Sequence, residues 1–106
     1  MATTPTLMYR GNLPGTTTTL YSGTATGTAI LTNIALANVS TSGLTATISL
    51  SGTNGSFALL SGVTIPGAST AFFDVKQVLT GSTQAITGLC SVSGGITAHL
   101  TGVVII

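Results

Sequence analysis

The chain has 106 residues, of which 3% are charged, and its formal net charge at pH 7 is +1. Two cationic side chains cannot neutralise the several phosphates on which nucleic-acid binding depends, so we expect no nucleic-acid partner. A lone cysteine excludes an internal disulfide. The N-terminus lacks the apolar run of a signal peptide, and no apolar stretch is as long as a membrane span, so we expect no signal peptide and no transmembrane segment. A chain of this length has room for one domain, which we expect to span residues 1–106.

The composition favours strands and turns. Threonine contributes 22 residues, serine 11 and glycine 14. Threonine is β-branched and fits a pleated surface, whereas the charged residues that fill the polar face of an amphipathic helix are nearly absent. We therefore predict an all-β protein.

Turn signals divide the chain into about eight short extended segments. In chain order, the segments are 6–10, 16–22, 28–39, 44–50, 57–65, 69–75, 85–92 and 96–105. Residues 1–6 lead into the first segment and are a candidate N-terminal arm that extends onto a neighbouring subunit. Short segments at this spacing predict a single antiparallel β-sandwich or jelly roll.

The residue patterns of individual segments predict how they are buried. Segment 28–39 has apolar residues at both parities, which is typical of a strand covered on both sides. Segment 44–50 alternates apolar residues with threonine and serine, which predicts one buried face and one wetted face. Asn54-Gly55 between apolar runs predicts a hairpin. The apolar C-terminal "GVVII" is a candidate edge strand for a neighbour.

The stretch "FFDVKQ" at 72–77 contains two of the three formally charged residues, Asp74 and Lys76. Residues two apart in a strand share a face, so Phe72 points outward with this pair while Phe73 and Val75 point inward. The alternative is that Asp74 caps a single helical turn over residues 75–78.

Two interpretations of this charge pair stay open. In the first, an exposed pair marks the outer face and blunts pairing at a sheet edge. In the second, the pair meets a neighbouring subunit and fixes its orientation, because so few other charges are available. The candidate subunit-interface residues are the charged and aromatic side chains Arg10, Tyr21, Phe72, Asp74 and Lys76.

The inventory of reactive groups is too small for known catalytic arrangements. Asp74, His99 and Cys90 are the only carboxylate, imidazole and thiol side chains, so a carboxylate pair and a closed four-ligand zinc site are both excluded. No serine lies in a Gly-x-Ser-x-Gly elbow. We expect His99 on a wetted face and Cys90 as a small buried hydrophobe. The sequence predicts no enzyme activity, catalytic residue, cofactor or metal.

Four stretches of the chain follow one another in a characteristic order. They are "LY" at 20–21, a segment ending in "NVS" at 32–40, a Pro-led turn running into "DVKQVL" at 65–79, and "HLTGV" at 99–103. This plan resembles that of a family of small bacteriophage virion proteins. The resemblance implies a β-sandwich on the virus particle, with no cofactor and no active site. Residues 80–86 lack the acidic turn usual in the family, so we expect no charge-mediated contact there.

The first functional hypothesis is a non-enzymatic capsid decoration protein, made in the host cytoplasm and located in the virion. Its partners are then other virion proteins, above all the major capsid protein, and further copies of itself in a homo-oligomer such as a trimer at local symmetry axes. One alternative is a tail-associated virion protein with the same fold. An alternative of another class is a carbohydrate- or receptor-binding module that uses Tyr21 and Phe72 as aromatic platforms.

Overall fold

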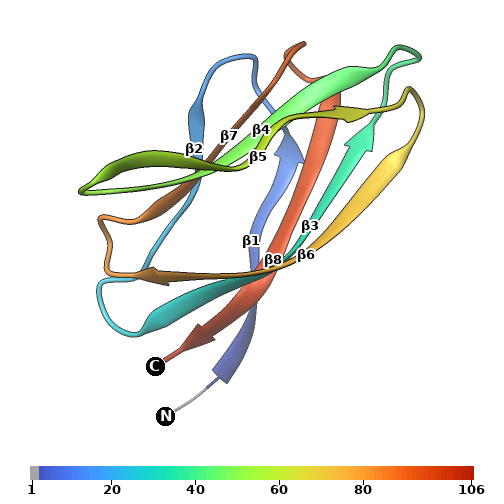
Figure 1. The fold of residues 1–106 in the computed structure, drawn as a ribbon. Helices are drawn as coiled ribbons and strands as arrows, with labels where there is room; N and C mark the ends of the chain where they lie inside the picture. Colours follow the sequence, from blue (N-terminus) through green and yellow to red (C-terminus); the bar gives the residue numbers. More distant parts are fainter. Residues whose placement is uncertain (1–2) are drawn as a thin grey trace.

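The computed structural model describes residues 3–106, which form eight strands in two four-stranded sheets and contain no helix (Figure 1). In chain order, the strands are β1 (Thr3–Asn12), β2 (Thr18–Ser22), β3 (Thr28–Asn38), β4 (Leu44–Gly52), β5 (Gly55–Ile65), β6 (Thr70–Thr80), β7 (Ala85–Cys90) and β8 (Ile96–Ile105). The prediction of an all-β fold with about eight strands is confirmed.

The strand order identifies the type of sandwich. Sheet A has the order β1-β8-β3-β6 and sheet B the order β2-β7-β4-β5, and all neighbouring strands are antiparallel. The chain crosses between the sheets at every connection except the β4–β5 hairpin. Eight strands wound between two antiparallel sheets in this way make a jelly roll.

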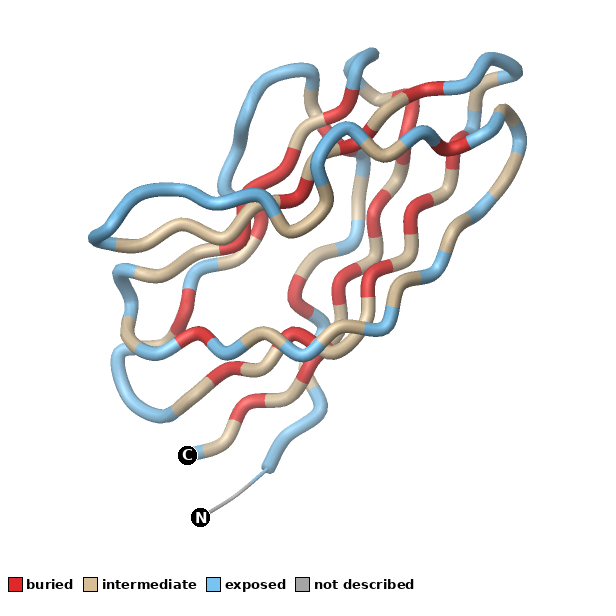
Figure 2. The backbone as a smooth tube through the Cα atoms, in the orientation of Figure 1, coloured by how far each residue is buried: buried red, intermediate tan, exposed pale blue. Residues whose placement is uncertain are grey.

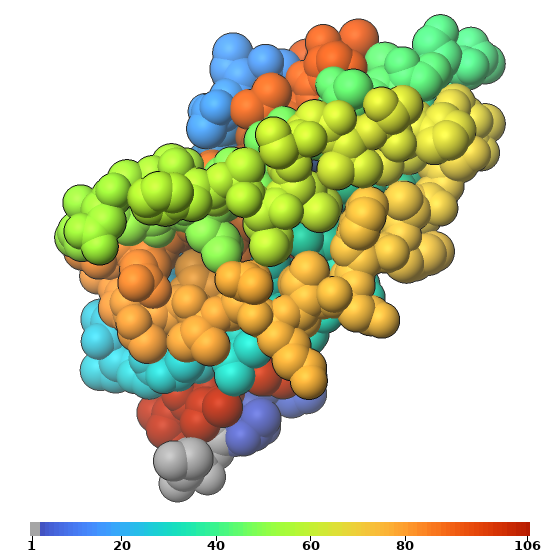
Figure 3. Space-filling model, viewed as in Figure 1, coloured from blue at the N-terminus to red at the C-terminus, as the bar shows by residue number. Residues whose placement is uncertain are grey.

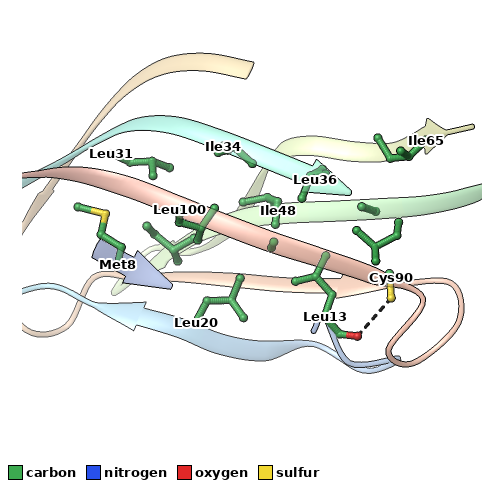
Figure 4. Close-up of a cluster of buried hydrophobic side chains, with 14 of the residues drawn as sticks. Met8, Leu13, Leu20, Leu31, Ile34, Leu36, Ile48, Ile65, Cys90 and Leu100 are labelled. Atoms are coloured by element: carbon green, nitrogen blue, oxygen red, sulfur yellow. Dashed lines mark hydrogen bonds between the residues drawn. The ribbon is translucent and has the colours of Figure 1, made fainter. Parts of the chain in front are cut away.

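The core fills the space between the two inner faces (Figure 2). In β4, Leu44, Ala46 and Ile48 are buried and alternate with half-buried hydroxyl residues, as predicted for this segment. In β8, Leu100 is fully enclosed, and it lies with Ile48 in the cluster drawn in Figure 4. The period-two pattern of the sequence therefore places apolar side chains on the inner faces of both sheets.

Strand β3 changes its buried parity at Thr32. Ala29 and Leu31 are buried before this residue, and Ile34 and Leu36 are buried after it. The pairing of β3 with β8 contains one extra β3 residue at this point, which is a β-bulge. The prediction that β3 is covered on both sides is wrong, because the bulge moves the apolar positions from odd to even residues while one face stays inside.

Strand β6 continues without interruption through the "FFDVKQ" stretch. Phe72, Asp74 and Lys76 are exposed, whereas Phe73 and Val75 pack against the core. The outward placement of the charge pair is confirmed. The alternative of a helical turn after Asp74 is wrong, because β6 stays extended through Val75 and Lys76 and pairs with β3 at Asp74 and again at Gln77 and Val78.

The first and last strands, β1 and β8, lie side by side in sheet A. β8 lies between β1 and β3, so the C-terminal apolar run is paired on both sides and the hypothesis that it adds an edge strand to a neighbour is wrong. Residues 3–6 of the candidate arm belong to β1 and pair with residues 102–105 of β8. Met1 and Ala2, the rest of the candidate arm, lie outside the described residues.

A buried amide ties the two sheets together after β3. The Asn38 side chain donates from Nδ2 to the carbonyl oxygens of Ser42, at 2.7 Å, and Ile65, at 2.9 Å. Its Oδ1 accepts from the Ser40 backbone N–H at 2.9 Å and from the Ser40 hydroxyl at 2.8 Å. Because Ile65 ends β5 in sheet B, this first residue of the "NVS" motif joins the end of sheet A to sheet B.

Candidate interaction surface

A row of side chains crosses the outer face of sheet A. Arg10 of β1 is the cross-strand partner of His99 of β8, which is also opposite Ala35 of β3. Ala35 is in turn opposite Phe72 of β6, whose side chain is 72% exposed. The cross-strand register therefore places a guanidinium at one edge of the sheet and an aromatic ring at the other.

The β3 bulge orients the carboxylate of Asp74. The extra residue turns Asn33 outward, where its Nδ2 donates a hydrogen bond to Asp74 Oδ1 at 3.1 Å. Thr32, at the bulge, donates from its hydroxyl to the Thr101 carbonyl oxygen at 3.2 Å. Without the bulge, Asn33 would share the inner face of Leu31. The local irregularity thus anchors the single carboxylate side chain of the protein on the outer face of sheet A.

Four of the five candidate interface residues share this face, namely Arg10, Phe72, Asp74 and Lys76. The fifth, Tyr21, lies in β2 of sheet B, where it is opposite Ile86 and packs against the core. The structure therefore places the charged candidates and Phe72 on one face of sheet A, and Tyr21 in sheet B. His99 is half-buried on the outer face of sheet A, while its neighbours Ala98 and Leu100 are inside, as predicted.

The same face carries apolar side chains that sequence reasoning did not single out. They are Leu7 in β1, Ile30 in β3, Val78 in β6 and Val103 in β8. Val78 has the outward parity of Phe72 and Lys76, so the alternation of β6 contained a signal for it. Ile30 has the parity of the buried Ile34, and only the bulge between them places it on the outer face.

The outer face of sheet B carries hydroxyl groups in place of charges. Thr87 of β7 is opposite Thr19 of β2 and Ser49 of β4, and Thr45 is opposite Thr64 of β5. All three formally charged residues of the chain lie in sheet A. Within residues 3–106, Thr87 Oγ1 is the buried side-chain oxygen that has no hydrogen-bond partner. Sheet B therefore offers an uncharged outer surface of hydroxyl side chains, with Leu89 of β7 among them.

A cleft separates the β4–β5 hairpin from the β6–β7 turn. The predicted hairpin is confirmed, but it closes through Gly52 opposite Gly55, so its two turn residues are Thr53 and Asn54 and not Asn54 and Gly55. The cleft holds about 220 Å³, and its lining includes Leu50, Asn54, Phe57, Val78 and Gln84. Gln84 Oε1 accepts from the Thr80 backbone N–H at 2.6 Å, which fixes that amide at the turn. Figure 3 shows this flank, where the edges of β5 and β6 lie one above the other.

The reactive groups of the described chain lie apart. Cys90 is buried, as predicted, and its thiol, which has one proton to donate, lies 3.3 Å from the Leu13 carbonyl oxygen (Figure 4) and 2.8 Å from the Val92 carbonyl oxygen. Within residues 3–106, no three His, Cys, Asp or Glu side chains come together as metal ligands would. The described residues also form no helix with the length and apolar character to cross a membrane.

Comparison with solved structures finds the same fold in virus particles. A chain in the crystal structure of the T13 particle of infectious bursal disease virus matches with a TM-score of 0.62 and 16% identity, over 98% of this chain and 31% of that chain. A chain of the VP2 subviral particle of this virus matches with a TM-score of 0.56 and 20% identity, over 97% and 32%. A chain of its Gx strain gives 0.56 and 19%, over 97% and 31%.

These likenesses show the fold alone, because the identities are low. The chain spans about a third of the length of the virus chains that it matches. No protein-family model and no curated protein matches the sequence.

Proposed function

We propose that this protein is a non-enzymatic structural component of a virion, and that it decorates the outer capsid shell of a bacteriophage. The observation that carries the proposal is the jelly roll itself, which matches chains of infectious bursal disease virus particles over nearly the whole sequence. The resemblance of the "LY", "NVS", "DVKQVL" and "HLTGV" stretches to small phage virion proteins supports the same proposal.

Because jelly rolls also occur in proteins with other functions, the surface must support this proposal as well. The two outer faces expose apolar and hydroxyl side chains over a sandwich that contains three formal charges. Contacts made by such groups depend on shape and hydrogen bonding and are weakly screened by salt. Contacts of this kind are suited to packing in many copies on a shell.

The test is the copy number of the protein in purified particles, measured by quantitative mass spectrometry against the major capsid protein. We expect on the order of hundreds of copies, retained through washes from low to high salt because few charges contribute to binding. A few dozen copies would replace shell decoration by the tail-associated alternative.

Absence from the particle would overturn both virion locations. It would favour the carbohydrate-binding alternative, for which the cleft offers an aromatic ring, Phe57, beside the amides of Asn54 and Gln84. The groups that bind sugars would then be sought in this cleft and not at Tyr21, which packs against the core.

A further inference from the structure

An uninterrupted apolar row crosses all four strands of sheet A on its outer face. Pro5 is opposite Val103, Val103 is opposite Ile30, and Ile30 is opposite Val78. The Val78 side chain is 58% exposed, and Leu7, next to this row on β1, is 51% exposed. A contiguous apolar patch of this kind on a small protein indicates a contact surface.

The formally charged residues of this face lie on its two edge strands, and the apolar row runs from one edge strand to the other. Arg10 is on edge strand β1, and Asp74 and Lys76 are on edge strand β6. The two middle strands present Ile30 and Val103 in the apolar row, and small, hydroxyl and polar residues such as Ala35, Thr101 and His99 beside it. Protein–protein interfaces likewise combine apolar contacts with polar and charged groups.

We propose that two copies of this chain pair through the outer faces of sheet A, about a twofold axis that runs parallel to the strands. Such an axis places β1 of one copy over β6 of the other, and β8 over β3. Pro5 then lies over Val78, and Val103 lies over Ile30. The apolar row therefore meets itself in reverse order, and each contact forms twice.

The same axis makes the charged edges complementary. Arg10 of one copy lies over the part of β6 that carries Phe72 and Asp74 in the other copy. The guanidinium can there cover the aromatic ring and bind the carboxylate that Asn33 already orients. Because this twofold axis brings the Arg10 guanidinium of β1 to Phe72 and Asp74 of β6, with Lys76 one outward position further along the strand, the partner that fits this surface is a second copy of the chain.

The size of the face sets the expected strength of pairing. Four strands about 4.8 Å apart, with roughly nine residues at about 3.4 Å each, give roughly 500–600 Å² per copy. Two such faces approach the lower limit of about 1,200 Å² for specific interfaces, so we expect the pairing to be reversible. Sheets stacked in this way cross at about 30°, which their twist produces.

This pairing is independent of the proposed place in the virion, because it concerns two copies of the isolated chain. The experiment is sedimentation velocity over a range of protein concentrations. We expect the full chain to form a dimer, Arg10→Asp and Asp74→Arg each to weaken it at least about tenfold, and the double variant to recover to within about threefold. Recovery requires that the two residues meet across the interface.

A second pair of variants separates this face from the rest of the surface. Val78→Lys places a charge in the apolar row and should weaken the dimer at least about tenfold. Thr64→Lys adds the same charge to an exposed position on the outer face of sheet B and should leave the dimer unchanged. Circular dichroism of each variant checks that the fold is kept.

A wild-type chain that stays monomeric at all concentrations would overturn the pairing, and a trimer would overturn the twofold axis. A double charge reversal that is no better than the single ones would overturn the contact between Arg10 and Asp74. None of these results changes the copy number in particles, so the pairing and the proposed function fail separately.

Discussion

The two sheets of this jelly roll share one core but present different outer faces. Sheet A displays Arg10, Asp74, Lys76 and His99 around an apolar row, whereas sheet B displays threonine and serine. In a chain with three formal charges, placing all of them on one face leaves the other without any group that could orient a charged partner. Sheet A is therefore suited to contacts of defined geometry, and sheet B to hydration or neutral packing.

The largest expected difference between the sheets is in the loss of stability when a glycine on the inner face of each sheet is replaced by alanine. A Cβ at Gly102 of β8 would meet the Ile30 carbonyl oxygen, which is backbone of the adjacent β3. A Cβ at Gly88 of β7 would meet the ends of flexible side chains, at 2.8 Å from Leu20 Cδ1 and 3.0 Å from Ile48 Cδ1. Urea unfolding should show that Gly102→Ala costs about 3 kcal/mol and Gly88→Ala about 1 kcal/mol. Equal losses would mean that β3 and β8 can separate locally as easily as side chains repack.

The next effect concerns the amide that joins the sheets. Asn38→Ala removes the hydrogen bonds to Ser40, Ser42 and Ile65 and leaves a buried carbonyl oxygen without its donor. We expect a loss of about 2–3 kcal/mol in the free energy of unfolding. Asn33→Ala is the matched control, because it removes an exposed amide from the outer face of the same strand, and it should cost no more than about 0.5–1 kcal/mol. Comparable losses would contradict the role given to Asn38.

The smallest expected effect is a change in stability on replacing a threonine by valine, and it has opposite signs in the two sheets. Thr87→Val in sheet B removes the buried hydroxyl that has no partner among the described residues and should stabilise the protein by about 0.5–1 kcal/mol. Thr32→Val in sheet A removes a hydroxyl that donates to the Thr101 carbonyl and should destabilise it by about the same amount. Melting temperatures measured by calorimetry would show the difference in sign. A destabilised Thr87→Val variant would indicate that this hydroxyl is hydrogen-bonded in solution.

Local patterns in the sequence were sufficient to predict much of the fold. The alternation in β4 and in the "FFDVKQ" stretch of β6 assigned inner and outer faces correctly, because a period of two is a property of each strand alone. The face of β3 could not be assigned in this way. The bulge at Thr32 exists only relative to the neighbouring strands β8 and β6, and an irregularity defined by partner strands leaves no periodic signal of its own.

The candidate surface was predictable only in its parts. The outward positions of Phe72, Asp74 and Lys76 followed from the alternation of one strand. The row from Arg10 through His99 to Phe72 depends on the pairing of four strands that are distant in sequence, which no local pattern contains. Tyr21 has the residue type of an interface platform, but its direction is set by the register of β2 against β7.

The pairing of Thr3 with Ile105 has a mechanical consequence. Tension applied to these two residues pulls β1 away from β8 across the ladder, and the antiparallel hydrogen bonds would rupture one pair after another. The β1–β8 ladder would therefore open at low force, starting from the pair of Thr3 and Ile105. Stress that enters through the broad faces of the sandwich is instead shared by many bonds at once. The sandwich would therefore resist load best when the load is applied across its two broad faces.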